Sequence, residues 1–150
     1  MIYQKTTDMV QIKKCTFEHM TKSYPCKEKS VLDGCMIMRQ SIKPEDVQSP
    51  FQVEAYALLF CISGEVNIIS DLRSYTVTPG TLFVYLPNNI IKIDCKKESI
   101  ISEVILASDY LRKNFLQWNK ISPLFIQTTN NPVITIPTDR RDELIRMLDN

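Results

Sequence analysis

Histidine is almost missing from this sequence of 150 residues, because His19 is the only one. The cysteines are odd in number and include no Cys-x-x-Cys pair; they are Cys15, Cys26, Cys35, Cys61 and Cys95. Zinc sites are built largely from imidazole and thiolate groups at close spacing, and a disulfide framework uses an even number of cysteines. We therefore expect no metal site built from imidazoles and no disulfide framework, and we interpret Cys61 and Cys95 as core residues.

The usual catalytic motifs are also missing. The sequence has no Gly-x-Ser-x-Gly elbow and no glycine-rich phosphate loop, and a serine or cysteine nucleophile would have only His19 as its base. Four carboxylates lie on predicted strands, where we expect them to face solvent: Glu54, Glu65, Asp94 and Glu103. We therefore expect a protein that is not an enzyme.

Long apolar runs and an excess of one charge are absent. The longest apolar run covers eight residues, Ala55–Ile62, which is too short to span a membrane. The N-terminus lacks the apolar segment of a signal peptide, which indicates a cytoplasmic location. Lys and Arg number 18 against 17 Asp and Glu, so the chain has no overall field that would attract nucleic acid.

Short β-rich runs separated by turn residues dominate the middle of the chain. The predicted strands are Cys35–Gln40, Val53–Ile62, Glu65–Ser70, Ser74–Thr78, Thr81–Leu86, Ile90–Cys95 and Ile100–Ala107. Pro79-Gly80 predicts a tight turn, because proline presets φ and glycine allows a positive φ. No helix lies between these strands to make parallel crossovers, so they must pair mainly antiparallel, in a sandwich or barrel.

The two ends of the chain differ from the middle. Residues 1–30 are polar and read as an arm of uncertain structure. Ser108-Asp109 is a plausible N-cap for a helix over Tyr110–Trp118, and a short strand, Val133–Ile136, precedes a second helix from Thr138. Some twenty residues separate the two helices, so they cannot form a helix-turn-helix.

Three segments carry a family resemblance: Phe60-Cys61-Ile62-Ser63-Gly64-Glu65, Tyr75-Thr76-Val77-Thr78-Pro79-Gly80 and Phe83-Val84-Tyr85-Leu86-Pro87. Ser108-Asp109-Tyr110-Leu111 then opens the helix after the barrel. Together they resemble the N-terminal cupin-like domain of AraC-family transcriptional regulators. The resemblance implies a mainly β, double-stranded β-helix (a jelly-roll barrel) over residues 31–107. It also implies a helical dimerisation or linker segment over 108–150, leading to a DNA-binding helix-turn-helix domain outside this chain.

The sequence lacks the metal-ligand pattern of the metal-binding cupins, which have the same type of barrel. Their His-x-His pattern would fall on Phe51, Gln52 and Val53, their glutamate on Ala57 and their last histidine near Lys92. We therefore expect a barrel without metal or other cofactor.

A ligand space is the remaining candidate site. The resemblance points Val53 and the residues that alternate with it inward, and these side chains are mostly small. They leave room for a ligand or belong to a narrow, filled barrel; both alternatives stay open. The candidate ligand-binding residues are Arg39, Ala57, Tyr75, Tyr85, Lys92 and Asp94. Lys92 either faces the interior, where it would select an anionic or polyhydroxyl ligand, or faces solvent.

The apolar helix face formed by Leu111, Phe115 and Trp118 predicts either a dimer contact or packing on its own barrel. We interpret the chain as the effector-binding or dimerisation domain of an AraC-type regulator, a homodimer with a sugar or organic acid as its effector. It would reach DNA only through the further domain and would not bind membranes. The alternative is a stand-alone metal-free cupin that binds or isomerises a small molecule. A regulator would continue past Asn150 into helix-turn-helix sequence, whereas an enzyme would end once the barrel is closed.

Overall fold

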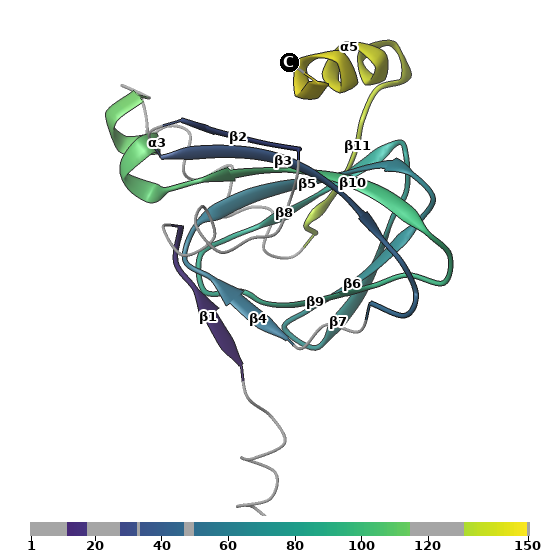
Figure 1. The fold of residues 1–150 in the computed structure, drawn as a ribbon, viewed down its shortest axis with the longest axis horizontal. Coiled ribbons are helices and arrows are strands. Elements are labelled where there is room, and N and C mark those ends of the chain that lie inside the picture. The colour runs from purple at the N-terminus through teal and green to yellow at the C-terminus, as the bar shows by residue number, and fades with distance from the viewer. Residues whose placement is uncertain (1–11, 18–27, 33, 47–49, 115–130, 150) are drawn as a thin grey trace, which may run out of the picture.

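The computed structural model describes residues 12–17, 28–32, 34–46, 50–114 and 131–149, whose strands form two sheets around a shared core (Figure 1). The five-stranded sheet has the order β1 (Lys13–Cys15), β4 (Phe51–Val53), β9 (Ile90–Asp94), β6 (Val66–Ser70) and β7 (Arg73–Val77). The six-stranded sheet has the order β11 (Val133–Thr135), β8 (Thr81–Tyr85), β5 (Tyr56–Ser63), β10 (Ser99–Leu106), β3 (Cys35–Ile42) and β2 (Glu28–Leu32). All pairs in these sheets are antiparallel except β1 with β4. The mainly β, antiparallel barrel predicted from the sequence is confirmed.

One predicted strand is divided in two. The sequence predicts a single strand over Val53–Ile62, but the backbone bends at Glu54-Ala55, so that β4 lies in one sheet and β5 in the other. The amide of Glu54 donates to the carbonyl of Cys15 at 3.0 Å, which ties the bend to β1. The alternation survives the bend, and the predicted inward set is buried in the core: Val53, Ala55, Ala57, Leu59 and Cys61. The other strands predicted between Cys35 and Ala107 are found with ends that agree to within two residues.

The turns use positive φ angles at other positions than the sequence suggests. Gly64 has φ +85° in the turn between β5 and β6, and Asp71 and Leu72 have φ +48° and +72° in the hairpin between β6 and β7. The Pro79-Gly80 turn is present and is closed by the amide of Thr81 donating to the carbonyl of Thr78 at 3.0 Å. Gly80, however, does not have a positive φ, so the reason given for this glycine from sequence is wrong.

Parts of the N-terminal arm belong to the barrel. Strand β1 extends the five-stranded sheet beside β4, and Cys15 and Phe17 pack against the core. Strand β2 pairs with β3 at the edge of the six-stranded sheet and crosses the boundary expected near residue 31.

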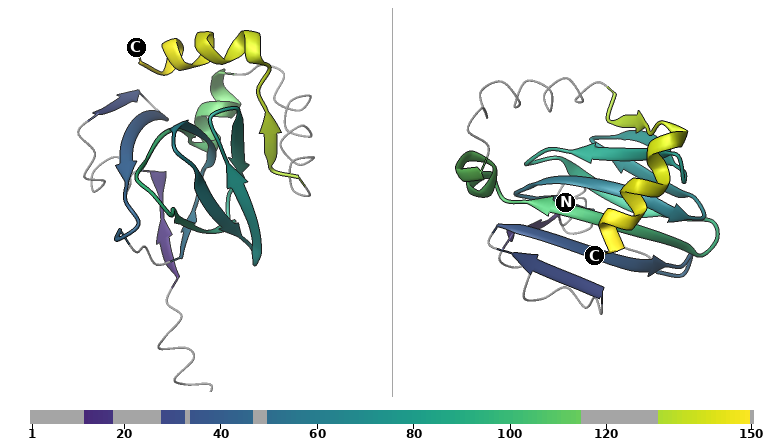
Figure 2. Two further views of the ribbon diagram at one scale, coloured as in Figure 1. Left: turned by 90° about the vertical axis from the view of Figure 1, so that its right-hand side faces the viewer. Right: turned by 90° about the horizontal axis from the view of Figure 1, so that it is seen from above.

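The C-terminal segment contains the two helices expected there, α3 (Ser108–Asn114) and α5 (Thr138–Asp149). Leu111 on α3 is 2% exposed, so this residue packs within its own chain, whereas Phe115 and Trp118 lie outside the described residues. Helix α5 lies across the outer face of the six-stranded sheet (Figure 2). Neither this helix nor α3, the two in the described ranges, is long and apolar enough to cross a membrane.

The Gly64 turn gives the first testable prediction. A Cβ at Gly64 would lie 2.3 Å from Ser99 Oγ and 2.9 Å from Ser99 Cα, and φ is positive. We expect Gly64→Ala to lower the free energy of unfolding by about 2–3 kcal/mol in urea titration, from backbone strain and overpacking. Ser63→Ala at the exposed neighbouring position is the control, and a Gly64→Ala chain as stable as this control would contradict the prediction.

Candidate functional site: a buried acid inside the barrel

Among the described residues, Glu103 is the one buried residue with a carboxyl, amino or guanidinium side chain, and 3% of its surface is exposed. It lies on β10, between β3 and β5 in the six-stranded sheet, and its neighbours on the same face are Ile101 and Ile105. The expectation that it faces solvent is therefore wrong, whereas Glu54, Glu65 and Asp94 are exposed as expected. Apolar residues occupy both faces of β10, so alternation along the sequence could not assign a solvent face to Glu103.

Two polar side chains meet the Glu103 carboxyl, one from the neighbouring strand β3 and one from β8, which lies beyond β5 in the sheet. The Tyr85 hydroxyl on β8 donates to Glu103 Oε2 at 2.5 Å, and Gln40 Nε2 on β3 donates to Oε1 over a longer distance of 3.5 Å. Neither partner is directly opposite Glu103 in the sheet, because its register partners are Met38 and Leu59. Gln40 therefore reaches Glu103 along a diagonal of the β3–β10 pair, whereas Tyr85 reaches it across β5. We call Gln40, Tyr85 and Glu103 the inner polar cluster.

Burial controls the protonation of this cluster. Desolvation raises the pKa of the Glu103 carboxyl above its ordinary value, and the hydrogen bonds from Tyr85 and Gln40 offset part of that rise in pKa. Burial thus shifts this carboxyl toward its neutral form, which can both accept hydrogen bonds and donate a proton.

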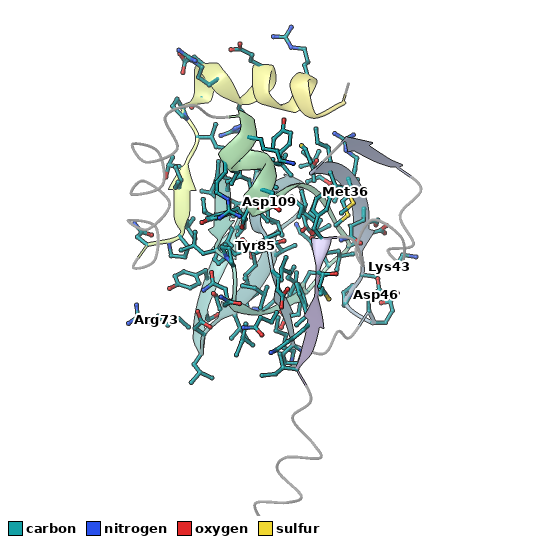
Figure 3. The ribbon with its side chains drawn as sticks, turned by 90° about the vertical axis from the view of Figure 1, so that its left-hand side faces the viewer. Met36, Lys43, Asp46, Arg73, Tyr85 and Asp109 are labelled. Carbon is teal, nitrogen blue, oxygen red and sulfur yellow. The ribbon has the colours of Figure 1, made fainter. Side chains whose placement is uncertain are left out.

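An aromatic row extends from the cluster toward the other sheet. The Phe83 and Tyr85 ring centroids are 6.1 Å apart, and those of Phe83 and Tyr75 are 5.6 Å apart, both pairs tilted. Phe83 and Tyr85 lie on β8, whereas Tyr75 lies on β7 in the five-stranded sheet. Figure 3 shows Tyr85 among the side chains between the two sheets. Phe83 and Tyr85 are fully buried and Tyr75 packs against the same core cluster, so the row connects the inner polar cluster with the five-stranded sheet.

Three of the six candidate residues come together here. Ala57 pairs in register with Tyr85, and Tyr75 reaches Tyr85 through the Phe83 ring. The small Ala57 side chain lies beside Tyr85, which is itself fully buried.

The other three candidates are on the outer faces of the sheets. Lys92 lies between the buried residues Ile91 and Ile93, and Asp94, on the same outer face, is exposed. Lys92 therefore lies on the outer face of the sheet and not in the core. Of the two alternatives from the sequence, the structure has the one in which Lys92 faces away from the barrel interior. Arg39 pairs with Ser102 on the face opposite that of Met38 and Glu103. The inner surface of the described residues thus holds an acid where the sequence suggested a lysine.

Sequence analysis did not place Glu103 and Gln40 in the site. A signal was present, because Glu103 is the one charged residue in the run Ile100–Leu106, which is apolar except for Ser102 and Glu103. A charged residue in a strand with two apolar faces must be paired or neutral if the strand is buried.

The inner polar cluster does not fit a resident metal ion. Its donors are one carboxyl, one phenol and one amide, and both Glu103 oxygens already accept hydrogen bonds. Over the described ranges, no group of three or more His, Cys, Asp or Glu side chains is placed to hold a metal.

Three cysteines of the described residues are buried: Cys35, Cys61 and Cys95. Cys61 and Cys95 lie in the main hydrophobic cluster, which confirms their interpretation as core residues. Burial raises the pKa of the Cys61 thiol to about 11 and also raises the pKa of Cys35 and Cys95. A raised thiol pKa leaves little thiolate at neutral pH, so these side chains are poor nucleophiles.

Comparison with known proteins adds evidence about the fold. No protein-family model and no curated protein matches the sequence. Among solved structures, a cupin superfamily protein from Desulfitobacterium hafniense matches with a TM-score of 0.50 and 18% identity, over 53% of this chain and 72% of that chain. A cupin-2 domain protein from Shewanella frigidimarina matches with a TM-score of 0.48 and 9% identity, over 68% and 89%.

The EutQ protein of Clostridium difficile matches with a TM-score of 0.45 and 16% identity, over 50% of this chain. This chain covers 58% of the length of that protein. The two-sheet architecture and the match to the Desulfitobacterium protein show that the barrel has a cupin fold, as the resemblance implied.

The buried acid predicts a specific pH dependence of stability. Folded Glu103 keeps its proton at pH values where the unfolded chain, with an ordinary pKa of 4.5, has released it. The stabilisation from this group is complete below pH 4.5 and is lost as the pH rises through the raised pKa of the folded state. Within that window, the free energy of unfolding of the wild type should fall relative to Glu103→Gln by about 1.4 kcal/mol per pH unit.

Urea titrations of the two chains at a series of pH values measure this difference. The other titratable groups contribute equally to both chains and cancel in the comparison. Parallel stability curves for the two chains would show that Glu103 titrates as an exposed carboxyl.

Proposed function

We propose that this chain is the effector-binding domain of an AraC-type transcriptional regulator, without enzymatic activity, cytoplasmic and dimeric, whose effector binds at the inner polar cluster. The observation that carries the proposal is the arrangement of the six-stranded sheet. Its inner face carries Tyr85 and Glu103, and helix α5 crosses its outer face (Figure 2). One sheet therefore joins a polar interior site to the segment that would lead to a DNA-binding domain.

The chemistry of the cluster favours one class of effector. A neutral carboxyl, a phenol and an amide provide donors and acceptors without fixed charge. In the described ranges, no buried lysine or arginine accompanies them to balance an anionic ligand. A polyhydroxyl ligand such as a sugar fits better than an organic acid, because its hydroxyls pair with Glu103 and Gln40 while its C–H faces pack on the aromatic row.

The regulatory mechanism would be a shift between conformations. A ligand can change the arrangement of the C-terminal segment only by as much as its affinity differs between two arrangements. Binding at Tyr85 and Glu103 would supply this difference by reorganising the side chains of the sheet that α5 covers.

A stand-alone cupin that binds or isomerises a small molecule is the second candidate. The observation that favours it is the buried acid itself, since a carboxyl with a raised pKa beside a phenol can transfer protons. The mass of the native gene product separates the two functions. A regulator needs about 100 further residues for its DNA-binding domain, whereas a stand-alone cupin would have a mass near 17.4 kDa.

Thermal shift against a panel of sugars, amines and organic acids tests the binding site. A ligand at 100 times its dissociation constant stabilises the folded chain by about 2.7 kcal/mol, and we expect such a shift from a polyhydroxyl ligand. Glu103→Gln and Tyr85→Phe should each reduce the shift by removing a group that the ligand contacts. Lys92→Ala is the matched control on the outer face and should leave the shift unchanged.

Two results would contradict this site. The first is the absence of any shift across the panel. The second is a shift that survives both Glu103→Gln and Tyr85→Phe but disappears in Lys92→Ala, which would place the ligand on the outer face.

A further inference from the structure

Helix α5 is tied to the barrel at the turn between β7 and β8. The amide of Ile136, two residues before the helix begins, donates to the carbonyl of Gly80 at 2.8 Å. Strand β11 pairs with β8 immediately beside this point, with Thr135 opposite Thr81. The chain that enters helix α5 therefore leaves the barrel at the Thr78–Gly80 turn, after β11 has paired with β8.

The first turn of the helix then rests on this same glycine. A Cβ built at Gly80 would lie 2.7 Å from Arg141 Nη2, so the guanidinium lies against backbone that has no side chain. Because Gly80 does not have a positive φ, the glycine is not required here by backbone conformation. What it provides is space for Arg141.

This contact is incomplete in a way that weakens it. Arg141 Nε is buried and, within the described residues, has no hydrogen-bond partner. A buried N–H without a partner opposes the docked arrangement, because water would satisfy it if the helix moved away. The absence of a side chain at Gly80 thus allows Arg141 to pack there, whereas the buried Arg141 Nε favours movement of the helix away from the barrel.

The same turn is continuous with the inner site. Tyr75 on β7 lies three residues before Thr78, and Phe83 on β8 lies three residues after Gly80. Hydrogen bonds stiffen the turn between them, including the amide of Thr78 to Thr81 Oγ1 at 3.0 Å. The aromatic row and Gly80 are therefore joined by a short, hydrogen-bonded stretch of chain.

We propose that the Gly80–Arg141 contact is the coupling element through which the state of the inner polar cluster controls how firmly helix α5 is held on the barrel. The proposal rests on the proposed function, since it describes how occupancy of that site reaches the C-terminal segment.

A double-mutant cycle followed by amide hydrogen exchange in the full chain tests the contact. Gly80→Ala places a methyl group against Arg141 and should raise the exchange rates of the α5 amides on the order of fivefold. In the Arg141→Ala background the same change at Gly80 should have little further effect, because the guanidinium that it displaces is gone. Arg140→Ala, at the exposed neighbouring position, is the control and should leave exchange in α5 unchanged.

Amides of β10 report whether the barrel stays folded in every variant. Equal effects of Gly80→Ala with and without Arg141, or faster exchange in β10 together with α5, would overturn the contact as the seat of the helix.

The coupling to the inner site is tested with Tyr85→Phe, which removes the hydroxyl that donates to Glu103. This variant should change exchange in α5 in the wild-type background and have no effect on it in the Arg141→Ala background. If Tyr85→Phe leaves α5 unchanged in both backgrounds, the coupling is overturned.

Failure of the proposed function would appear differently. A barrel that binds no ligand would show no thermal shift with the panel, while the cycle between Gly80 and Arg141 would still report the contact.

Discussion

The structure depends on removing one carboxyl from water. Glu103 lies on a strand inside the six-stranded sheet, and a charged carboxylate there would lose far more hydration than its surroundings return. Burial raises the pKa of the carboxyl toward the neutral form, and Tyr85 donates a hydrogen bond to it, which requires β8 and β10 to keep the alignment that brings the two side chains together. The acid is therefore also a register constraint on the sheet, because a slip by one residue would turn Glu103 to the other face.

The core between the two sheets explains why the acid is so well enclosed, because Ile101 and Ile105 on the same face of β10 belong to it. The five-stranded sheet covers the inner face, and helix α5 crosses the outer face, where Phe60 and Val84 are buried as well (Figure 2). The same arrangement gives the barrel its proposed use. A polar site inside and a helix outside share one sheet and meet at the Thr78–Gly80 turn, so the chemistry of the interior has a short path to the end of the domain.

The sequence was most informative about turns and alternation. Pro79-Gly80 marked a real turn, and the inward set from Val53 to Cys61 was predicted correctly although the strand bends between two sheets. In Ile90–Asp94, Lys92 and Asp94 share one face and Ile91 and Ile93 share the other. This alternation alone does not say which face points into the barrel. Glu103 was misplaced because β10 is apolar on both faces. The role of Gly80 was missed because it depends on Arg141, a partner distant in sequence that local turn chemistry does not reveal.

The protonation state of Glu103 in the folded chain is the most direct test of this account. Infrared difference spectroscopy between the wild type and Glu103→Gln at neutral pH separates the carbonyl stretch of a protonated acid from the bands of a carboxylate. The account predicts a protonated-acid band, shifted by the hydrogen bond from Tyr85, that is absent from the variant and moves in Tyr85→Phe. A carboxylate band in the wild-type spectrum would contradict it, because the barrel would then hold a charged group and would select its ligand by charge.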